Sequence, residues 1–139
     1  MATKPVIRRL FLVALMSLAT GLAGCVTTTD SRFSREADRQ EAVDNYVKLA
    51  TAYIGQGNID RARHHLDRAL KLDPDSPAAL AAMGLIYNTE GEAELAESNF
   101  RKAINADEGY TRARVYYGAF LYGQGRFADA RDQFRAASR

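Results

Sequence analysis

Residue types that commonly hold metals or cofactors are scarce in this 139-residue sequence, which has one cysteine, Cys25, and two histidines, His64 and His65. Neighbouring positions on a helix point about 100° apart, so these two imidazoles cannot hold one metal ion as a pair four residues apart can. The sequence has no further histidine, and its one cysteine is expected to carry lipid, so the nitrogen and sulfur ligands of a usual zinc site are too few. We therefore expect no metal site and no cofactor, and we place both histidines on a solvated helix face.

Paired carboxylates could act as a general acid and base, and examples are Asp73/Asp75 and Asp129/Asp132. Their surroundings predict turns or exposed helix positions, where carboxylates usually serve capping and solubility. The glycines do not form a phosphate-binding loop, because no strand precedes them and no Gly-Lys-Ser/Thr follows. The sequence therefore predicts a protein that is not an enzyme.

Cys25 has a different chemistry, set by the residues before it. The stretch Leu22-Ala23-Gly24-Cys25 resembles a lipobox, at which a diacylglyceryl group is placed on the thiol before a peptidase cuts. Small residues let an extended backbone enter the peptidase, and the thiolate is the nucleophile that accepts the lipid. A disulfide within the chain is impossible with one cysteine, and a buried cysteine would not directly follow an apolar leader. We predict that Cys25 is lipidated, with palmitate among its acyl chains.

The first 24 residues have the layout of a secretory signal. Lys4, Arg8 and Arg9 are followed by an uncharged run, residues 10–24, that ends in small residues. The alternative is a permanent membrane helix, which needs about 20 apolar residues. This shorter run is diluted by serine, threonine and glycine, so we predict a signal peptide over residues 1–24, cleaved before Cys25.

The charge balance excludes one class of partner. Of the 19 basic residues, three lie in the leader, so 16 basic and 17 acidic side chains remain from Cys25 onward. The remaining chain is then near a net charge of −1, whereas binding to phosphates needs a sustained basic excess. We expect no nucleic-acid partner.

Residues 25–40 are predicted to be the lipidated cysteine and a flexible tether, because the stretch after Cys25 is polar and has no clear period. The folded domain is placed at residues 41–139. Helical character is expected from about Ser34 onward.

The folded part repeats itself at a strict spacing of 34 residues, in units 43–76, 77–110 and 111–139, the last one incomplete. Small residues, turn glycines and large apolar residues recur in register, in the sets Ala50/Gly84/Gly118, Gly57/Gly91/Gly125 and Leu66/Phe100/Phe134. This pattern resembles the tetratricopeptide repeat. The resemblance implies an all-α, right-handed solenoid of helix-turn-helix pairs with about three repeats.

Each recurring position has a mechanical reason. A small residue in the first helix of a repeat lets the second helix approach closely, and large apolar residues fill the space between the pairs. A turn glycine can take a positive φ and end the first helix. Ser76-Pro77 is typical of a helix start, and Thr111 is expected to cap the next repeat in the same way.

Tetratricopeptide repeats present their first helices along a concave groove, at the second, fifth, ninth, twelfth and thirteenth positions of each repeat. The candidate groove residues are Val47, Thr51, Ile54, Leu85, Asn88, Val115, Ala119 and Tyr122. Several of them are apolar, which suits an amphipathic helix or extended apolar peptide as the ligand. The alternative is that they are ordinary exposed aliphatics.

Two stretches, residues 117–127 and 49–57, resemble the type IV pilus biogenesis and stability lipoproteins, which are pilotins of the pilus secretin. The resemblance implies an outer-membrane lipoprotein that faces the periplasm, binds secretin subunits in its groove, escorts them and promotes their assembly. It makes the first-repeat groove, with Val47, Thr51 and Ile54, the favoured docking surface. Val26 is not the aspartate associated with inner-membrane retention, which agrees with outer-membrane sorting.

Members of that family usually have about six repeats, and Tyr122 stands where relatives often have a cysteine. Phe127, Phe134 and Ala137 have no following repeat to cover them. Either the array is longer or another copy or partner buries them, and we favour a longer array. The alternative function is another envelope tetratricopeptide-repeat lipoprotein, a scaffold for outer-membrane protein insertion or a regulator of a cell-wall synthase.

Overall fold

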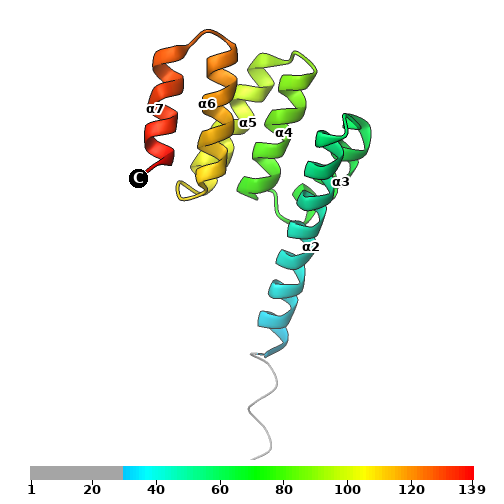
Figure 1. Cartoon of the computed structure of the whole chain (residues 1–139). Helices are drawn as coiled ribbons and strands as arrows, with labels where there is room; N and C mark the ends of the chain where they lie inside the picture. The colour runs from blue at the N-terminus through cyan, green and yellow to red at the C-terminus, as the bar shows by residue number, and fades with distance from the viewer. Residues whose placement is uncertain (1–29) are drawn as a thin grey trace, which may run out of the picture. The chain divides into compact units, whose positions relative to one another are not determined.

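The computed structural model describes residues 30–139, so the predicted signal peptide and Cys25 lie outside the described residues. The described part is built of helices without strands (Figure 1): α2 (Asp30–Gly55), α3 (Ile59–Leu72), α4 (Pro77–Thr89), α5 (Ala93–Ala106), α6 (Thr111–Gly123) and α7 (Phe127–Ala137). Residues 38–139 form one compact unit, and the residues up to Ala37 belong to a separate unit. None of the described helices is long and apolar enough to cross a membrane.

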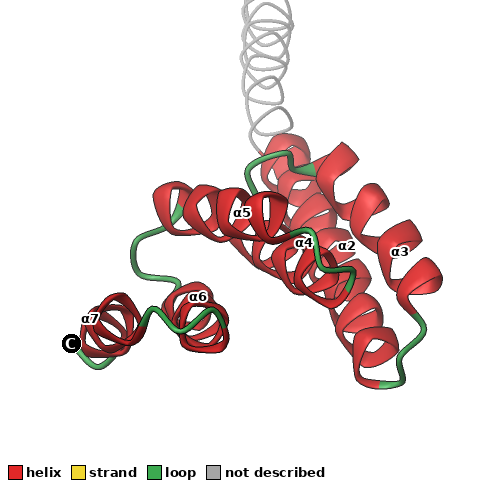
Figure 2. Ribbon diagram, turned by 90° about the horizontal axis from the view of Figure 1, so that it is seen from above, coloured by secondary structure: helices red, strands yellow, loops and turns green. Residues whose placement is uncertain are grey.

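Consecutive helices pack as antiparallel pairs, and the pairs stack on one another. Within residues 38–139, α4 packs on α5 and α6 packs on α7, while α4 also contacts α3 and α6 (Figure 2). The pair α4/α5 lies within the unit 77–110 and the pair α6/α7 within the unit 111–139, whereas α2 begins before residue 43. The predicted all-α tetratricopeptide-repeat solenoid is therefore confirmed.

Small residues set the distance between the two helices of a pair. A Cβ atom added to Gly84 would lie 2.6 Å from the ring of Phe100, and one added to Gly118 would lie 2.7 Å from the ring of Phe134. Alanines at the facing positions of the second helices, Ala62, Ala96 and Ala130, are buried. The predicted close approach of helices within a repeat is confirmed.

The helix boundaries follow the predicted turn residues with one exception. Gly57, Gly91 and Gly125 have φ values of 72°, 80° and 76°, a region that side-chain-bearing residues rarely adopt. Ser76 caps α4, since its hydroxyl accepts a hydrogen bond from the Ala79 amide at 3.3 Å. The prediction that Thr111 caps the third repeat is wrong. Thr111 is the first residue of α6, and its hydroxyl instead donates to the Gly109 carbonyl at 3.4 Å.

Helix α2 starts earlier than the domain boundary that we infer from sequence. It includes residues 30–40, which the composition alone assigns to a flexible tether. Good helix formers such as Arg35, Glu36 and Ala37 let the helix extend backwards from its packed part without a buried face of its own. Gln40 also donates from its side chain to the Asp44 carboxylate at 3.1 Å, one turn later.

Candidate protein-binding surface

The candidate groove residues come from the first helices of the three repeats, α2, α4 and α6. Helix α4 contacts α6, and Val43 and Ala50 of α2 share a buried cluster with Ile86 of α4. The three first helices are therefore neighbours within residues 38–139. Equivalent positions on them recur along one face of the array, as a continuous binding surface requires.

The third repeat presents the most accessible apolar groove residues. Val115 is 40% exposed and Tyr122 is 63% exposed, and Ala119, one turn from Val115, is exposed too. Thr51 and Asn88, from the first two repeats, add polar groups to the same face. Part of the hydrogen-bonding capacity of Thr51 is used locally, because its hydroxyl donates to the Val47 carbonyl at 2.9 Å.

The remaining apolar candidates, Val47, Ile54 and Leu85, are only partly exposed. Val47 and Ile54 pack against the buried cluster that joins α2, α3 and α4. Leu85 packs against the cluster of the second and third repeats, which contains Phe100. The structure therefore places more free apolar surface in the third repeat than in the first, although the pilotin resemblance favours the first.

A pocket beside Val115 extends this surface and cannot be recognised from the repeat spacing. It encloses about 630 Å³ at the start of α6, and its lining includes the side chains of Tyr110, Arg112, Val115 and Tyr116. Burial raises the pKa of the Tyr110 phenol, and the nearby Arg112 guanidinium partly opposes this. The negative charge of Asp44 on α2 also raises the Tyr110 pKa, as a smaller cause than burial.

A polar network fixes the third repeat to the second. The Tyr117 hydroxyl donates to Glu97 at 2.6 Å, and Arg126 binds both oxygens of Glu97 at 2.9 and 3.0 Å. These contacts hold the pKa of Glu97 below its usual range, with the Tyr117 hydrogen bond as the largest cause. Burial raises the Tyr117 pKa, and its hydrogen bond to Glu97 adds to the effect.

The histidines differ from each other in environment. His64 is exposed as expected, but His65 does not lie on a solvated face, and that prediction is wrong. Its ring stacks between Tyr53, at 5.5 Å between centroids, and Tyr46, at 6.0 Å. Its Nδ1 is buried without a hydrogen-bond partner among the described residues. The Arg61 guanidinium lies over the same Tyr53 ring, 5.6 Å from its centroid.

The carboxylate pairs lie in local contacts. Asp73 Oδ1 accepts a hydrogen bond from the Asp75 amide at 3.2 Å, and Asp129 pairs with Arg126 at 2.8 Å. Within residues 30–139, no group of three or more His, Cys, Asp or Glu side chains could hold a metal ion. What this geometry offers is a binding surface of aliphatic and aromatic side chains with a few charges.

Comparison with known proteins agrees with the paired-helix architecture. The tetratricopeptide-repeat family model matches residues 47–111. A crystal structure of MamA superposes with a TM-score of 0.56 at 27% identity, covering 68% of this chain and 56% of MamA. Together with the fold described above, these matches show that the described part of this chain has the tetratricopeptide-repeat fold.

Within that class, the chain is closely related to type IV pilus assembly protein PilF of Pseudomonas aeruginosa. The two are 39% identical over 122 residues, which is 87% of this chain and 48% of PilF. A structure from the functional characterisation of P. aeruginosa PilF superposes with a TM-score of 0.70 at 38% identity, covering 73% of this chain and 46% of that one. The chain thus spans about half the length of PilF.

Proposed function

We propose that this protein is an outer-membrane lipoprotein, a pilotin that binds secretin subunits and promotes their assembly in type IV pilus biogenesis. The observation that carries the proposal is the 39% identity to a pilus assembly protein over 87% of this chain. The lipobox-like sequence that ends at Cys25 supports a membrane anchor in the same chain.

In the proposed mechanism the protein acts by binding a secretin subunit on its groove surface. The face of α6 bears the exposed side chains of Val115, Ala119 and Tyr122, so it suits an apolar helix or extended segment of a secretin subunit. A single acyl chain gives only marginal membrane attachment, whereas several chains together hold a protein stably. A bound subunit would therefore be carried to the membrane to which Cys25 is fixed.

Lipidation can be tested with Cys25→Ser. We expect this variant to leave the outer-membrane fraction and secretin multimers to fall in parallel, while secretin monomers accumulate elsewhere. Wild-type protein and a Thr27→Ser variant serve as controls. Normal secretin multimers in cells that carry only Cys25→Ser would rule out escort by a lipid-anchored carrier.

The role of the groove in secretin binding can be tested by replacing its exposed apolar side chains with acidic ones. Val115→Glu combined with Ala119→Glu should weaken secretin capture, because an apolar segment would then have to desolvate two carboxylates. Leu95→Glu on α5 is the matched control, since Leu95 is 46% exposed and is not a groove position. If Leu95→Glu lowers secretin capture as much as the groove variant does, the concave surface is not the docking site.

The second candidate function is that of another envelope scaffold, which acts in outer-membrane protein insertion or regulates a cell-wall synthase. Its support is the tetratricopeptide-repeat match over residues 47–111, because this fold presents binding surfaces without fixing the partner. Capture from detergent extract separates the two functions. Recovery of insertion machinery or a cell-wall synthase, without secretin, would support this second function.

A further inference from the structure

A polar pocket lies between the second and third repeats, and the candidate groove residues do not line it. It encloses about 290 Å³. Its lining comes from α5, α6 and α7, with the side chains of Arg101, Ile104, Asn105, Arg114, Tyr117 and Gln133. Pockets for small molecules usually enclose about 300–1,000 Å³, so this one has the size for a single side chain or a small ion.

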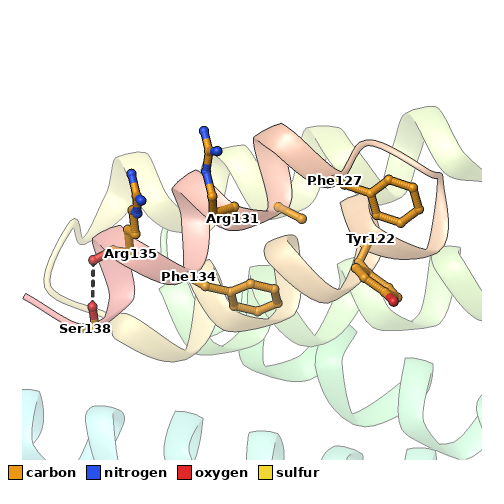
Figure 3. Close-up of a pocket in the computed structure, with 7 residues that line it drawn as sticks. Tyr122, Phe127, Arg131, Phe134, Arg135 and Ser138 are labelled. Atoms are coloured by element: carbon orange, nitrogen blue, oxygen red, sulfur yellow. Dashed lines mark hydrogen bonds between the residues drawn. The ribbon is translucent and has the colours of Figure 1, made fainter.

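Arg114 stands in this pocket where the other two repeats have a large apolar residue. The fourth residue of the repeat is Tyr46 in the first repeat and Leu80 in the second. Leu80 is only 8% exposed, and Tyr46 packs against a buried cluster. Arg131 and Arg135 extend from the surface of α7 (Figure 3), and both are exposed. Arg114 is instead half-buried, and its guanidinium has no hydrogen bond or ion pair within residues 30–139. A partly buried charge without a counterion is costly to a fold, which points to a role in binding.

Gln133 adds a second unsatisfied group to the same pocket. Its side-chain Oε1 is buried and accepts no hydrogen bond within the described part of the chain. Buried amide oxygens are almost always paired, so this atom needs an N–H or O–H donor. The pocket thus presents a cation that lacks an anion and an acceptor that lacks a donor.

The other arginine of the pocket is already paired. Arg101 donates from Nε to the Tyr117 hydroxyl at 3.2 Å and from Nη2 to Glu97 at 2.9 Å. The Tyr117 hydroxyl in turn donates to Glu97 at 2.6 Å. One uncompensated positive charge, that of Arg114, therefore remains among the lining residues, and it matches a ligand with one negative charge.

A second cavity adjoins the first at Asn105, whose exposed side chain lines both. This cavity encloses about 600 Å³, and its lining includes Pro74, Asp75, Leu80 and Lys102. It has one acidic and one basic side chain, so it does not itself select an anion. A ligand that enters the first pocket can continue past Asn105 into the second, which suits an extended segment of chain.

The pocket belongs to a repeat boundary that the described residues contain in full. At the boundary of the first and second repeats, Asp67 and Lys71 stand where Arg101 and Asn105 stand here. Both are exposed although the third repeat follows them. A further helix pair after α7 would therefore leave this side of α5 open in the same way.

We propose that this pocket binds an acidic side chain from an extended segment of a partner protein. The carboxylate pairs with Arg114, because guanidinium and carboxylate form strong, often bidentate hydrogen bonds. A backbone N–H of the same segment donates to Oε1 of Gln133, and Ile104 provides an apolar wall for the methylene groups of the acidic side chain. A phosphate dianion fits less well, since the lining residues include no second unpaired cation. The proposal does not depend on the proposed function.

The probe is the peptide N-acetyl-Gly-Glu-Gly-amide, and the corresponding Gly-Gln-Gly peptide is the matched neutral probe. NMR spectra of the full chain, isotope-labelled and purified in nonionic detergent, follow the side-chain amide of Gln133 and the Nε–H of Arg114 during each titration. We expect saturable shifts of both signals with the glutamate peptide. The glutamine peptide should bind at least about tenfold more weakly.

Variants of the chain locate the binding site. Arg114→Gln should raise the Kd of the glutamate peptide at least about fivefold, and Gln133→Leu should weaken binding as well. Arg112→Gln is the matched control for net charge and should leave the Kd unchanged, because Arg112 is exposed on the same helix and does not line the pocket. Arg114→Leu, which introduces the residue of the second repeat, should abolish binding and raise the midpoint of urea unfolding.

Each of four results would overturn the proposal. The first is an absence of saturable shifts at Gln133 and Arg114, and the second is equal affinity for the two peptides. The third is a lower urea midpoint of Arg114→Leu, which would make Arg114 a residue that holds the fold. The fourth is tighter binding of inorganic phosphate than of the glutamate peptide, which would make the pocket a site for small anions.

Discussion

Glu97 accepts hydrogen bonds from side chains that belong to three different parts of the chain. Tyr117 on α6 donates at 2.6 Å, Arg126 before α7 donates to both carboxylate oxygens, and Arg101 on α5 donates at 2.9 Å. Together they lower the Glu97 pKa from its ordinary value of 4.5, against the effect of burial. One carboxylate thus joins the second and third repeats.

Removing the Tyr117 hydroxyl should raise the pKa of Glu97. Because this pKa is lower in the folded state, Glu97 stabilises the fold above its unfolded pKa, and the contribution is lost as the pH falls through the folded value. We expect Tyr117→Phe to destabilise the protein at neutral pH and to flatten the loss of stability below about pH 4.5. Carboxyl NMR titration and urea unfolding at several pH values measure the two effects. An unchanged Glu97 pKa in Tyr117→Phe would contradict this account.

Gly84 and Gly118 both face a phenylalanine ring at a distance that leaves no room for a Cβ. Phe100, which faces Gly84, is fully buried, whereas Phe134, which faces Gly118, can shift towards solvent. We expect Gly84→Ala to lower the free energy of unfolding by about 1–3 kcal/mol through overpacking. Gly118→Ala should be close to neutral, because a helix-propensity gain of about 1 kcal/mol offsets a smaller clash. Urea unfolding of both variants tests the difference, and equal costs would contradict it.

At the scale of elements, the turn between α6 and α7 depends on one backbone conformation. Gly125 has a φ of 76°, where a side chain costs about 1–2 kcal/mol. Gly123, two residues earlier, ends α6 and has nothing within 4 Å of an added Cβ. Gly125→Ala should therefore destabilise by about 1 kcal/mol, while Gly123→Ala should be neutral or stabilising. Thermal unfolding of the pair gives the comparison, and a Gly125→Ala protein as stable as Gly123→Ala would contradict it.

The helix pairs could be predicted from sequence because the residues that end the helices and allow them to pack closely recur every 34 residues. Gly57, Gly91 and Gly125 end the first helices, and Gly84 and Gly118 admit the rings of the second. Each cause lies within one repeat, so its spacing is visible in the sequence. The helix pairs and their order follow directly from these positions.

Features that depend on which side chains of a neighbouring helix face a residue could not be predicted. Glu97 and Tyr117 are twenty residues apart, and no spacing marks their contact. His65 stacks on two tyrosines of α2 rather than facing water. Val47 and Ile54 occupy groove positions, but their side chains pack against the buried cluster to which α2, α3 and α4 contribute. The position of a residue in the repeat predicts the helix face on which its side chain lies. The exposed fraction of that side chain depends on the neighbouring helix that packs against this face.

At the scale of residues 38–139 as a whole, each repeat is stabilised by its neighbours, as in other repeat arrays. The second repeat is covered on both sides, since Ile86 and Phe100 are fully buried. The third repeat is covered only by the second, and Phe127 and Phe134 remain exposed on α7. Local stability should therefore differ along the array, although the helices look alike.

Hydrogen exchange can measure this difference. We expect amides of α7 to exchange at least about tenfold faster than amides of α5, a gap of about 1.4 kcal/mol in opening free energy, because among the described helices α7 packs only on α6. Arg126→Ala should widen the gap by removing the contact to Glu97, whereas Arg135→Ala, on the same helix, should leave it unchanged, since no ion pair of Arg135 is present in the described part. Exchange followed by mass spectrometry resolves the two helices. Equal protection of α5 and α7 would contradict this expectation. It would mean that the second and third repeats open together, because the Glu97 network couples them strongly.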